Sequence, residues 1–284
     1  MVSRIVLVCV ACVAVIAATG CGGSDESGDA LVGAFYPLAA ALRAVAPGGA
    51  DVLDLTPPGA EPHDIELGAR DVGRLGDAAL VVYAGGGFQP AVEDALVDRS
   101  GPSLDVQGEV DPLDGAGGET DPHVWLDPLR YAQIVRSVAD ALGRPEAADP
   151  LVGRLEALDR ELARGLGHCK RREIVTSHAA FAYLADRYGL EQVSLVGVTP
   201  EAEPDARDIE RLVDEVRRTG ATTVFVEPLV SPRLAETVAR EAGVSTAVLD
   251  PLEGLTPEQI EAGADYFSVM RENLAALRAA LGCT

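Results

Sequence analysis

Short apolar runs alternate with amphipathic segments along most of the chain. Runs such as 31–35 and 223–227 are mostly apolar, which predicts strands buried on both faces, whereas the segments between them space their apolar positions as helices do. The predicted strands are 31–35, 51–55, 79–84, 173–177, 193–198, 223–227 and 246–250. The predicted helices are 37–45, 69–75, 128–142, 179–188, 206–219 and 232–242. This alternation predicts an α/β fold with two mainly parallel sheets, each flanked by helices.

One long helix is predicted between the two sheets. Leucines recur at spacings of three and four from Leu151 to Leu162, Pro150 suits a first helical turn, and Gly165 and Gly167 end the pattern. The chain is therefore expected to comprise an N-terminal lobe, 29–144, a linker helix within 145–168 and a C-terminal lobe, 169–284.

The first twenty residues have the pattern of an export signal. A positive charge at Arg4 precedes an apolar run over 5–18, which is too short for a comfortable membrane span. Small residues then lead to Cys21, and this ending resembles a bacterial lipoprotein signal in which that cysteine is lipidated. The alternative is an uncleaved membrane anchor. We expect a signal peptide over 1–20, a lipid-anchored tether over 21–28, and an extracytoplasmic protein held to the cell membrane.

Composition narrows the possible partners. The 284 residues include 23 basic and 45 acidic side chains, a net charge of −22, which argues against nucleic acid because phosphate binding needs a basic face. The same charge repels anionic lipid surfaces and suits a protein that meets cations. A hydrophobic fraction of 48% excludes a wholly disordered chain.

The cysteines predict a disulfide bond. Cys9 and Cys12 leave with the signal, and Cys21 takes the lipid, so that Cys169 and Cys283 remain as an even pair in an oxidising compartment. A cysteine-based metal site is the weaker alternative, because no CxxC spacing exists outside the signal.

Three of the four histidines lie where ligands bind in α/β proteins. His63 follows one predicted strand, His178 ends another, and His123 lies in a proline-stiffened loop before a helix. Ligands of open α/β sheets bind beyond the carboxyl ends of the strands. His168, by contrast, lies in a polar stretch. Each histidine taken alone is equally explained as a hydrogen-bonded loop residue, so the joint pattern carries the prediction.

Asp250 is the carboxylate candidate, since it ends a predicted strand, although it also suits a turn cap before Pro251. Three neutral imidazoles and one carboxylate make a tetrahedral site suited to Zn²⁺, whereas Mn²⁺ or Mg²⁺ prefers more oxygen ligands.

Seven stretches resemble the solute-binding proteins of zinc-uptake ABC transporters, in the order of that family and over about residues 31–260. They are FYPLAAAL, LTPPGAEPHDIEL, ALVVYAGGGFQP, DPHVWLDP, VTSHAAFAYLADRYGL, VFVEPLVSP and LDPLEGL. The resemblance implies two α/β lobes joined by one rigid helix, with the metal held in the cleft between them. It also implies that His63, His123 and His178 are ligands and that Asp250 stands where a fourth, carboxylate ligand is often found. Manganese-binding relatives have Glu in place of His178.

The implied function is capture of Zn²⁺ outside the cytoplasm and delivery to an ABC transporter permease, which is served by an ATPase inside the cell. The chain is expected to act as a monomer, with the N-terminal lipid as its membrane contact and no nucleic acid partner.

Two departures from the family pattern concern acidic residues. The segment 105–120 stands where many zinc-binding members have a histidine-rich loop, but it contains acidic residues and no histidine, so we expect a solvated loop. Glu227 ends a strand and is expected to accept an imidazole N–H rather than to bind metal, and Glu61 and Asp64 have the same possibility with less support.

Other functions fit the sequence less well. A zinc-dependent hydrolase is the rival from a different class, but the HExxH, HxE…PCxxC and GxSxG motifs are absent. A structural zinc site usually uses cysteines. Manganese or iron uptake on the same scaffold remains the alternative to zinc.

Overall fold

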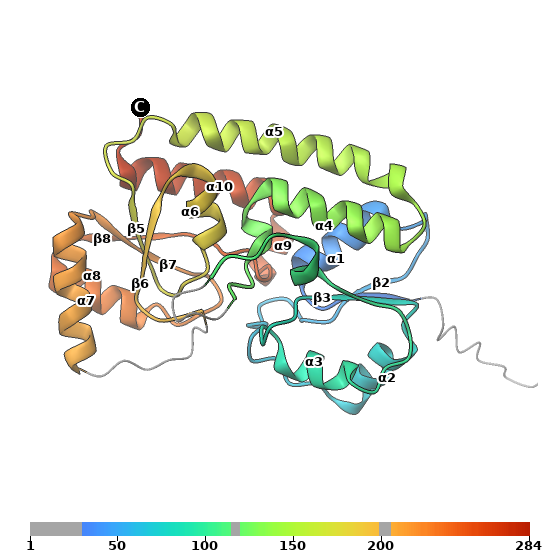
Figure 1. Cartoon of the computed structure of the whole chain (residues 1–284). Helices are drawn as coiled ribbons and strands as arrows, with labels where there is room; N and C mark the ends of the chain where they lie inside the picture. Colours follow the sequence, from blue (N-terminus) through green and yellow to red (C-terminus); the bar gives the residue numbers. More distant parts are fainter. Residues whose placement is uncertain (1–29, 115–119, 199–205) are drawn as a thin grey trace, which may run out of the picture.

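Two parallel four-stranded sheets form the framework of the protein in a computed structural model that describes residues 30–114, 120–198 and 206–284. In the first sheet the strand order is β2-β1-β3-β4. Its strands are β1 (Leu31–Gly33), β2 (Val52–Asp54), β3 (Leu80–Tyr83) and β4 (Ser103–Asp105), and its flanking helices are α1 (Tyr36–Val45), α2 (Ala69–Asp77) and α3 (Pro90–Leu96). Figure 1 shows this sheet with α2 and α3 on one side and α1 on the other.

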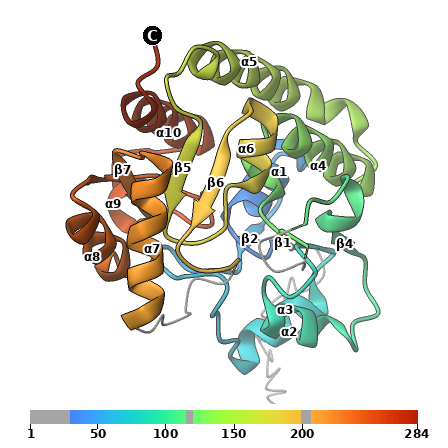
Figure 2. The same ribbon diagram turned by 60° about the vertical axis from the view of Figure 1, so that its left-hand side comes forward.

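The second sheet repeats the topology of the first, with the order β6-β5-β7-β8. It contains β5 (Glu173–Thr176), β6 (Glu191–Ser194), β7 (Thr223–Val226) and β8 (Ser245–Val248), with α6 (Ala182–Tyr188), α7 (Ala206–Thr219) and α8 (Arg233–Ala242) (Figure 2). In both sheets the chain places its second strand on one side of the first and its third strand on the other. At such a reversal, open α/β sheets bind ligands beyond the carboxyl ends of the central strands. The predicted α/β class with two parallel sheets is confirmed.

Three long helices connect the sheets: α4 (Pro128–Ala141), α5 (Asp149–Leu166) and α10 (Tyr266–Leu281). They pack side by side above the two sheets in Figure 1. The leucine spacing recognised in the sequence is the buried stripe of α5, where Leu155, Leu158 and Leu162 are inaccessible to solvent. At 1.5 Å per residue, the 18 residues of α5 span about 27 Å.

The buried side chains form one large core and one small one. The large core runs from β1 and β3 through α4 and α5 to α10, and the small core lies between β5, β7, α7 and α8. Because the first sheet and the connecting helices share a core, bending at α5 would expose packed apolar surface. This packing therefore predicts a rigid connection between the two sheets through α5.

Some elements differ from the sequence-based expectation. The expectation omitted β4, α3, α9 (Pro257–Glu261) and α10, and it placed β6 two residues late. The edge strands β4 and β6 read Ser-Leu-Asp and Glu-Gln-Val-Ser, which lack the apolar run of a buried strand.

The acidic segment 105–120 is not wholly a solvated loop. Asp105 ends β4, and Val106–Glu109 form a 3₁₀ turn in which Val106 is fully buried. Residues 115–119 of this segment lie outside the described residues, as do the predicted signal, the tether and Cys21. Within the described ranges, no helix is long and apolar enough to cross a membrane.

The expected disulfide between Cys169 and Cys283 is present. It joins the segment after α5 to the segment after α10, across 114 positions of sequence. His168 lies beside it, exposed, and its carbonyl accepts a hydrogen bond from the backbone N–H of Thr284.

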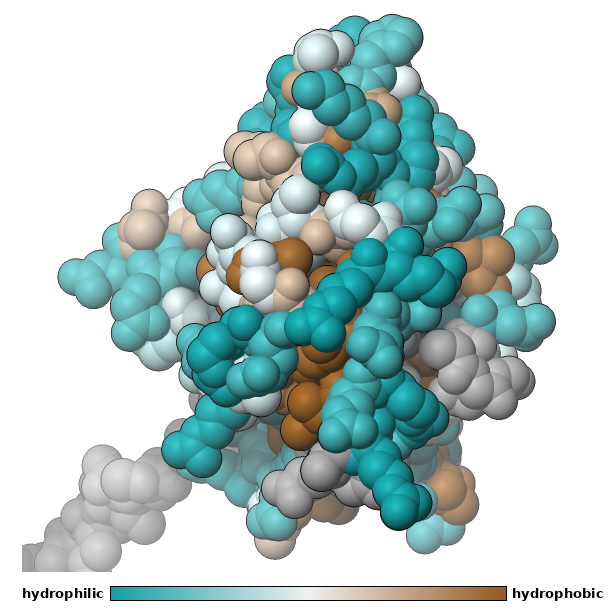
Figure 3. Space-filling view, turned by 90° about the vertical axis from the view of Figure 1, so that its left-hand side faces the viewer, coloured by the Kyte–Doolittle hydropathy of each residue, from teal (hydrophilic) through white to brown (hydrophobic). Residues whose placement is uncertain are grey.

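The side of the molecule that carries α7 and α8 is mainly hydrophilic, with a narrow hydrophobic band in its middle (Figure 3).

Candidate metal centre

Four side chains from separate loops meet at one buried point between the two sheets. His63 lies in the loop after β2, His178 lies two residues after β5, and Glu253 lies in the loop after β8. His123 precedes the 3₁₀ turn Val124–Leu126 at the start of α4. One ligand atom from each of these residues lies within 4.8 Å of all the others, and none of the four residues is more than 8% exposed.

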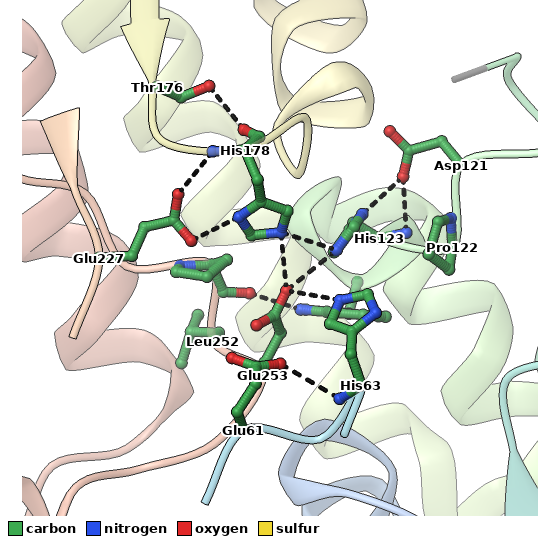
Figure 4. A network of polar contacts seen from close by, with 12 residues as sticks. Glu61, His63, Asp121, Pro122, His123, Thr176, His178, Glu227, Leu252 and Glu253 are labelled. Carbon is green, nitrogen blue, oxygen red and sulfur yellow. Dashed lines mark hydrogen bonds and ion pairs between the residues drawn. The ribbon is translucent and has the colours of Figure 1, made fainter. Parts of the chain in front are cut away.

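Four of the six distances between these atoms are close to those around a tetrahedral ion. Oε1 of Glu253 lies 2.9 Å from Nε2 of His123, 3.3 Å from Nε2 of His178 and 3.5 Å from Nε2 of His63. The Nε2 atoms of His123 and His178 are 3.4 Å apart. Zinc binds nitrogen and oxygen ligands at about 2.0–2.1 Å, so the ligand atoms of a tetrahedral zinc ion lie about 3.3 Å from one another. Figure 4 shows the three rings converging on the carboxylate.

Two buried carboxylates orient the imidazole rings. Nδ1 of His123 lies 2.8 Å from Oδ1 of Asp121, and Nδ1 of His178 lies 2.6 Å from Oε2 of Glu227 (Figure 4). Each carboxylate also accepts the backbone N–H of its histidine, at 2.8 Å and 3.1 Å. A proton held on Nδ1 leaves the lone pair of Nε2 free to face the centre, as a metal ligand requires.

His63 is held differently. Its backbone N–H donates to Oε1 of Glu61 at 3.1 Å, and the ring of Phe88 packs on its imidazole with the ring centres 4.4 Å apart. Nε2 of His63 and Oε2 of Glu253 are both buried and have no hydrogen-bond partner within the part of the chain that the structure describes. Polar atoms left in this way are costly unless another group satisfies them.

The electrostatics of the centre favour a cation. Burial disfavours the charged form of His178, but the negative charges of Glu227 and Glu253 outweigh it and raise its pKa well above the usual value. The pKa of His123 is raised in the same way, because Asp121 and Glu253 outweigh the effect of burial. Burial would raise the pKa of Glu253, but the neighbouring histidines, His178 first, hold it well below the usual value. Three carboxylates therefore surround three imidazoles, and a divalent ion would offset two of their three negative charges.

Asp250 is not part of this group. Its Oδ1 accepts the backbone N–H of Leu252 at 2.7 Å, and its Oδ2 accepts a hydrogen bond from Nε2 of Gln259 at 2.7 Å. Burial raises its pKa to about 6. The carboxylate that meets the histidines is Glu253, three residues further along, because the chain bends sharply at Leu252, where φ is 56°. The structure thus places Asp250, the expected carboxylate ligand, outside the group of four.

The other residues expected from the sequence lie beside the centre or away from it. Glu227 contacts His178 as an imidazole acceptor, Glu61 supports the backbone of His63, Asp64 is exposed, and His168 lies outside the group. Glu253 and Asp121 were not expected from the sequence. The place of Asp121 two residues before His123, directly ahead of Pro122, was a usable signal.

These features define the class: a two-lobed α/β protein with a buried His₃Glu metal centre between its sheets. Residues 31–280 match the model of the family described as zinc-uptake complex component A, periplasmic, and the chain belongs to this family. That description is of a transport component and not of an enzyme.

The chain is similar to named proteins of known structure or function. It is 36% identical over 283 residues to the zinc-binding protein AdcA of Streptococcus pyogenes serotype M1, covering 87% of this chain and 55% of that protein. The chain therefore spans about half the length of the first curated relatives it matches. It is 29% identical to the high-affinity zinc uptake system protein ZnuA of Bacillus subtilis (strain 168), with 95% of each chain covered. The crystal structure of the Zn(II)-bound ZnuA-like domain of Streptococcus pneumoniae AdcA aligns with a TM-score of 0.76 and 36% identity, covering 89% of this chain and 99% of that one.

Proposed function

We propose that this protein captures Zn²⁺ outside the cytoplasm and delivers it to the permease of an ABC transporter, which an ATPase drives from inside the cell. The observation that carries the proposal is the group of three imidazole Nε2 atoms around Oε1 of Glu253, at 2.9–3.5 Å from it. The names of the relatives, zinc-binding protein and zinc uptake system protein, support zinc as the cargo.

In this proposal His63, His123, His178 and Glu253 are the four ligands. Asp121 and Glu227 hold the Nδ1 protons of two of them, which fixes the ring orientation and increases the basicity of Nε2. Because a histidine must be neutral to bind metal, zinc displaces protons from the centre.

Zinc fits the donor set better than manganese does. Three nitrogen ligands and one carboxylate in tetrahedral positions suit Zn²⁺, whereas Mn²⁺ prefers a larger number of oxygen ligands. A hydrolytic role is disfavoured, because a catalytic zinc keeps an open position for water and this centre offers four enclosed protein ligands.

The proposed attachment to the membrane rests on the sequence. We propose that signal cleavage leaves Cys21 as a lipidated N-terminus, that a short polar tether precedes the fold, and that the protein works as a monomer. Intact mass of the exported protein, expected to show the chain beginning at Cys21 with added lipid, tests this part separately.

Competition between metals tests the cargo. Protein stripped with a chelator and titrated with equal concentrations of Zn²⁺ and Mn²⁺ is expected to retain one Zn²⁺ per chain. Preferential retention of Mn²⁺, or a stoichiometry well above one, would contradict the proposal.

A further inference from the structure

The loop that carries Glu253 is held by an unusual set of hydrogen bonds that begins at Asp250. We propose that Asp250, together with Gln259, is a positioning pair that sets the place of Glu253 in the metal centre without touching the metal. This inference rests on the proposed zinc site and deepens it.

Asp250 supports the bend that turns the chain toward the centre. Leu252 has a φ of 56° and is the one non-glycine residue with positive φ in the described ranges. Left-handed backbone is unfavourable for a leucine side chain, so the bend needs support from its surroundings. Oδ1 of Asp250 supplies it by accepting the N–H of Leu252 at 2.7 Å, and Glu253 is the next residue.

Gln259 holds the other oxygen of Asp250 in a defined orientation. Its Nε2 donates to Oδ2 of Asp250 at 2.7 Å, while its Oε1 accepts the backbone N–H of Thr256 at 2.8 Å. The amide cannot be turned over without placing two donors against each other. The backbone of Asp250 is fixed as well, because its N–H and carbonyl both bond to the side chain of Asn273 on α10, at 2.8 Å and 2.7 Å.

The far side of the same loop docks against the loops of two other ligands. The indole N–H of Trp125, two residues after His123, donates to the carbonyl of Pro251 at 2.7 Å. The N–H of Gly59, in the loop that carries His63, donates to the carbonyl of Leu255 at 3.0 Å. A shift at Asp250 would therefore move Glu253 relative to His63 and His123, and ligand distances in a metal site tolerate only about 0.2 Å.

Exchanging the carboxylate of Asp250 and the amide of Gln259 distinguishes a positioning role of Asp250 from direct binding of metal by Asp250. In Asp250→Asn, Oδ1 still accepts from Leu252, but the new amide N–H₂ faces the N–H₂ of Gln259. In Gln259→Glu, two carboxylates face each other. In the double variant, Glu at 259 accepts from both Asn at 250 and Thr256, which restores every hydrogen bond and keeps the number of charges. Glu258→Gln, an exposed change on the same short helix, is the matched control.

Zinc affinity of the full chain, measured by competition with a chelator, is the readout, with the visible spectrum of the Co²⁺-loaded protein as a second. We expect each single variant to bind zinc about 10-fold more weakly, the lower end of the range for outer-shell changes. We expect the double variant to return to within about 3-fold of the wild type, with a wild-type Co²⁺ spectrum, and Glu258→Gln to change neither. Should Asp250→Asn fail to fold, the double variant still decides the matter.

Three results would overturn the inference. If Asp250 were itself a ligand, the double variant would stay as weak as Asp250→Asn and the Co²⁺ spectrum would change. If Asp250→Asn bound zinc as tightly as the wild type, Asp250 and Gln259 would have no positioning role. If the double variant failed to fold, the exchanged pair would not reproduce the hydrogen bonds of the original pair, and the inference would fall. A wild type that bound no zinc would refute the proposed function itself, whereas the other results leave that function standing.

Discussion

Glu227 provides a sharp test of how the centre is built, through the isosteric change Glu227→Gln. Oε1 of Glu227 accepts the backbone N–H of His178 at 3.1 Å, and Oε2 of Glu227 lies 2.6 Å from Nδ1 of the ring in an ion-pair contact, so its two oxygens serve two nitrogen-bound hydrogens when Nδ1 carries a proton. A glutamine side chain has one oxygen to accept them and presents an N–H₂ group to the other. Either the backbone N–H loses its partner, or the ring proton moves to Nε2 and blocks the ligand atom.

The expected loss lies between 10- and 100-fold in zinc affinity, the range found for partners of metal-bound histidines. This corresponds to about 1.4–2.8 kcal/mol of binding free energy. The side chain of Glu227 is 2% exposed, so water cannot readily replace its carboxylate.

The same contact predicts how the loss depends on pH. Glu227 and Glu253 raise the pKa of His178 in the metal-free protein, so a proton competes with zinc up to a pH well above 6.5. Removing the charge of Glu227 lowers that pKa and weakens the competing proton. The wild type is therefore expected to exceed the variant in zinc affinity by the largest factor near pH 8, and this factor is expected to decrease toward pH 6.

The raised pKa of His178 also predicts how the stability of the metal-free protein depends on pH. A raised pKa stabilises the metal-free fold at pH below the unfolded value of about 6.5, and this stabilisation is lost as the pH rises through the folded-state pKa. Glu227→Gln should therefore lower the melting temperature of metal-free protein more at pH 6 than at pH 9.

Titration calorimetry with a competing chelator at pH 6, 7 and 8 measures the affinities, and Glu236→Gln, an exposed change on α8, is the control. If Glu227→Gln bound zinc at pH 8 as tightly as the wild type, Glu227 would not be needed to hold the proton on Nδ1 of His178. If the loss of affinity did not vary with pH, the charge of Glu227 would not control the competing proton.

Alanine at His63, His123, His178 or Glu253 is expected to weaken zinc binding at least 100-fold and His168→Ala to leave it unchanged, as chelator competition would show; equal losses at His168 and His178 would contradict the site. Zinc at a thousand-fold excess over its Kd should stabilise the protein by about 4 kcal/mol, measured as a rise in Tm over metal-free protein, and no rise would mean that folded and unfolded chains bind zinc alike. Alkylation without reduction should leave Cys169 and Cys283 unmodified in the intact mass, and their reduction should lower Tm, because the bond closes a loop that is worth up to about 4–5 kcal/mol in the chain-entropy model. Leu158→Ala, at a fully buried position on α5, should cost about 2–5 kcal/mol in denaturant unfolding, and a cost below 1 kcal/mol would contradict a tightly packed connection.

Local pattern was sufficient for most of the framework of this protein, although not for β4 or α10. Apolar runs identify buried parallel strands because such strands are covered on both faces, and the leucines of α5 identify a helix because their spacing repeats along one side. The histidines that meet at the centre could be chosen because two of them follow strands, and the carboxyl ends of parallel strands converge. The cysteine pair followed from counting and compartment.

Tertiary structure alone decided which carboxylate lies among the three histidines. Asp250 and Glu253 are three residues apart in one loop, and the strand pattern of the sequence singled out only Asp250. The choice depends on Gln259, on Asn273 and on the bend at Leu252, which turn Asp250 inward to its own loop and Glu253 toward the histidines. Likewise, the pairing of His178 with Glu227 joins residues 49 positions apart. Such contacts depend on the direction in which a side chain leaves a loop, and that direction is set by hydrogen bonds to distant elements rather than by the residues on either side.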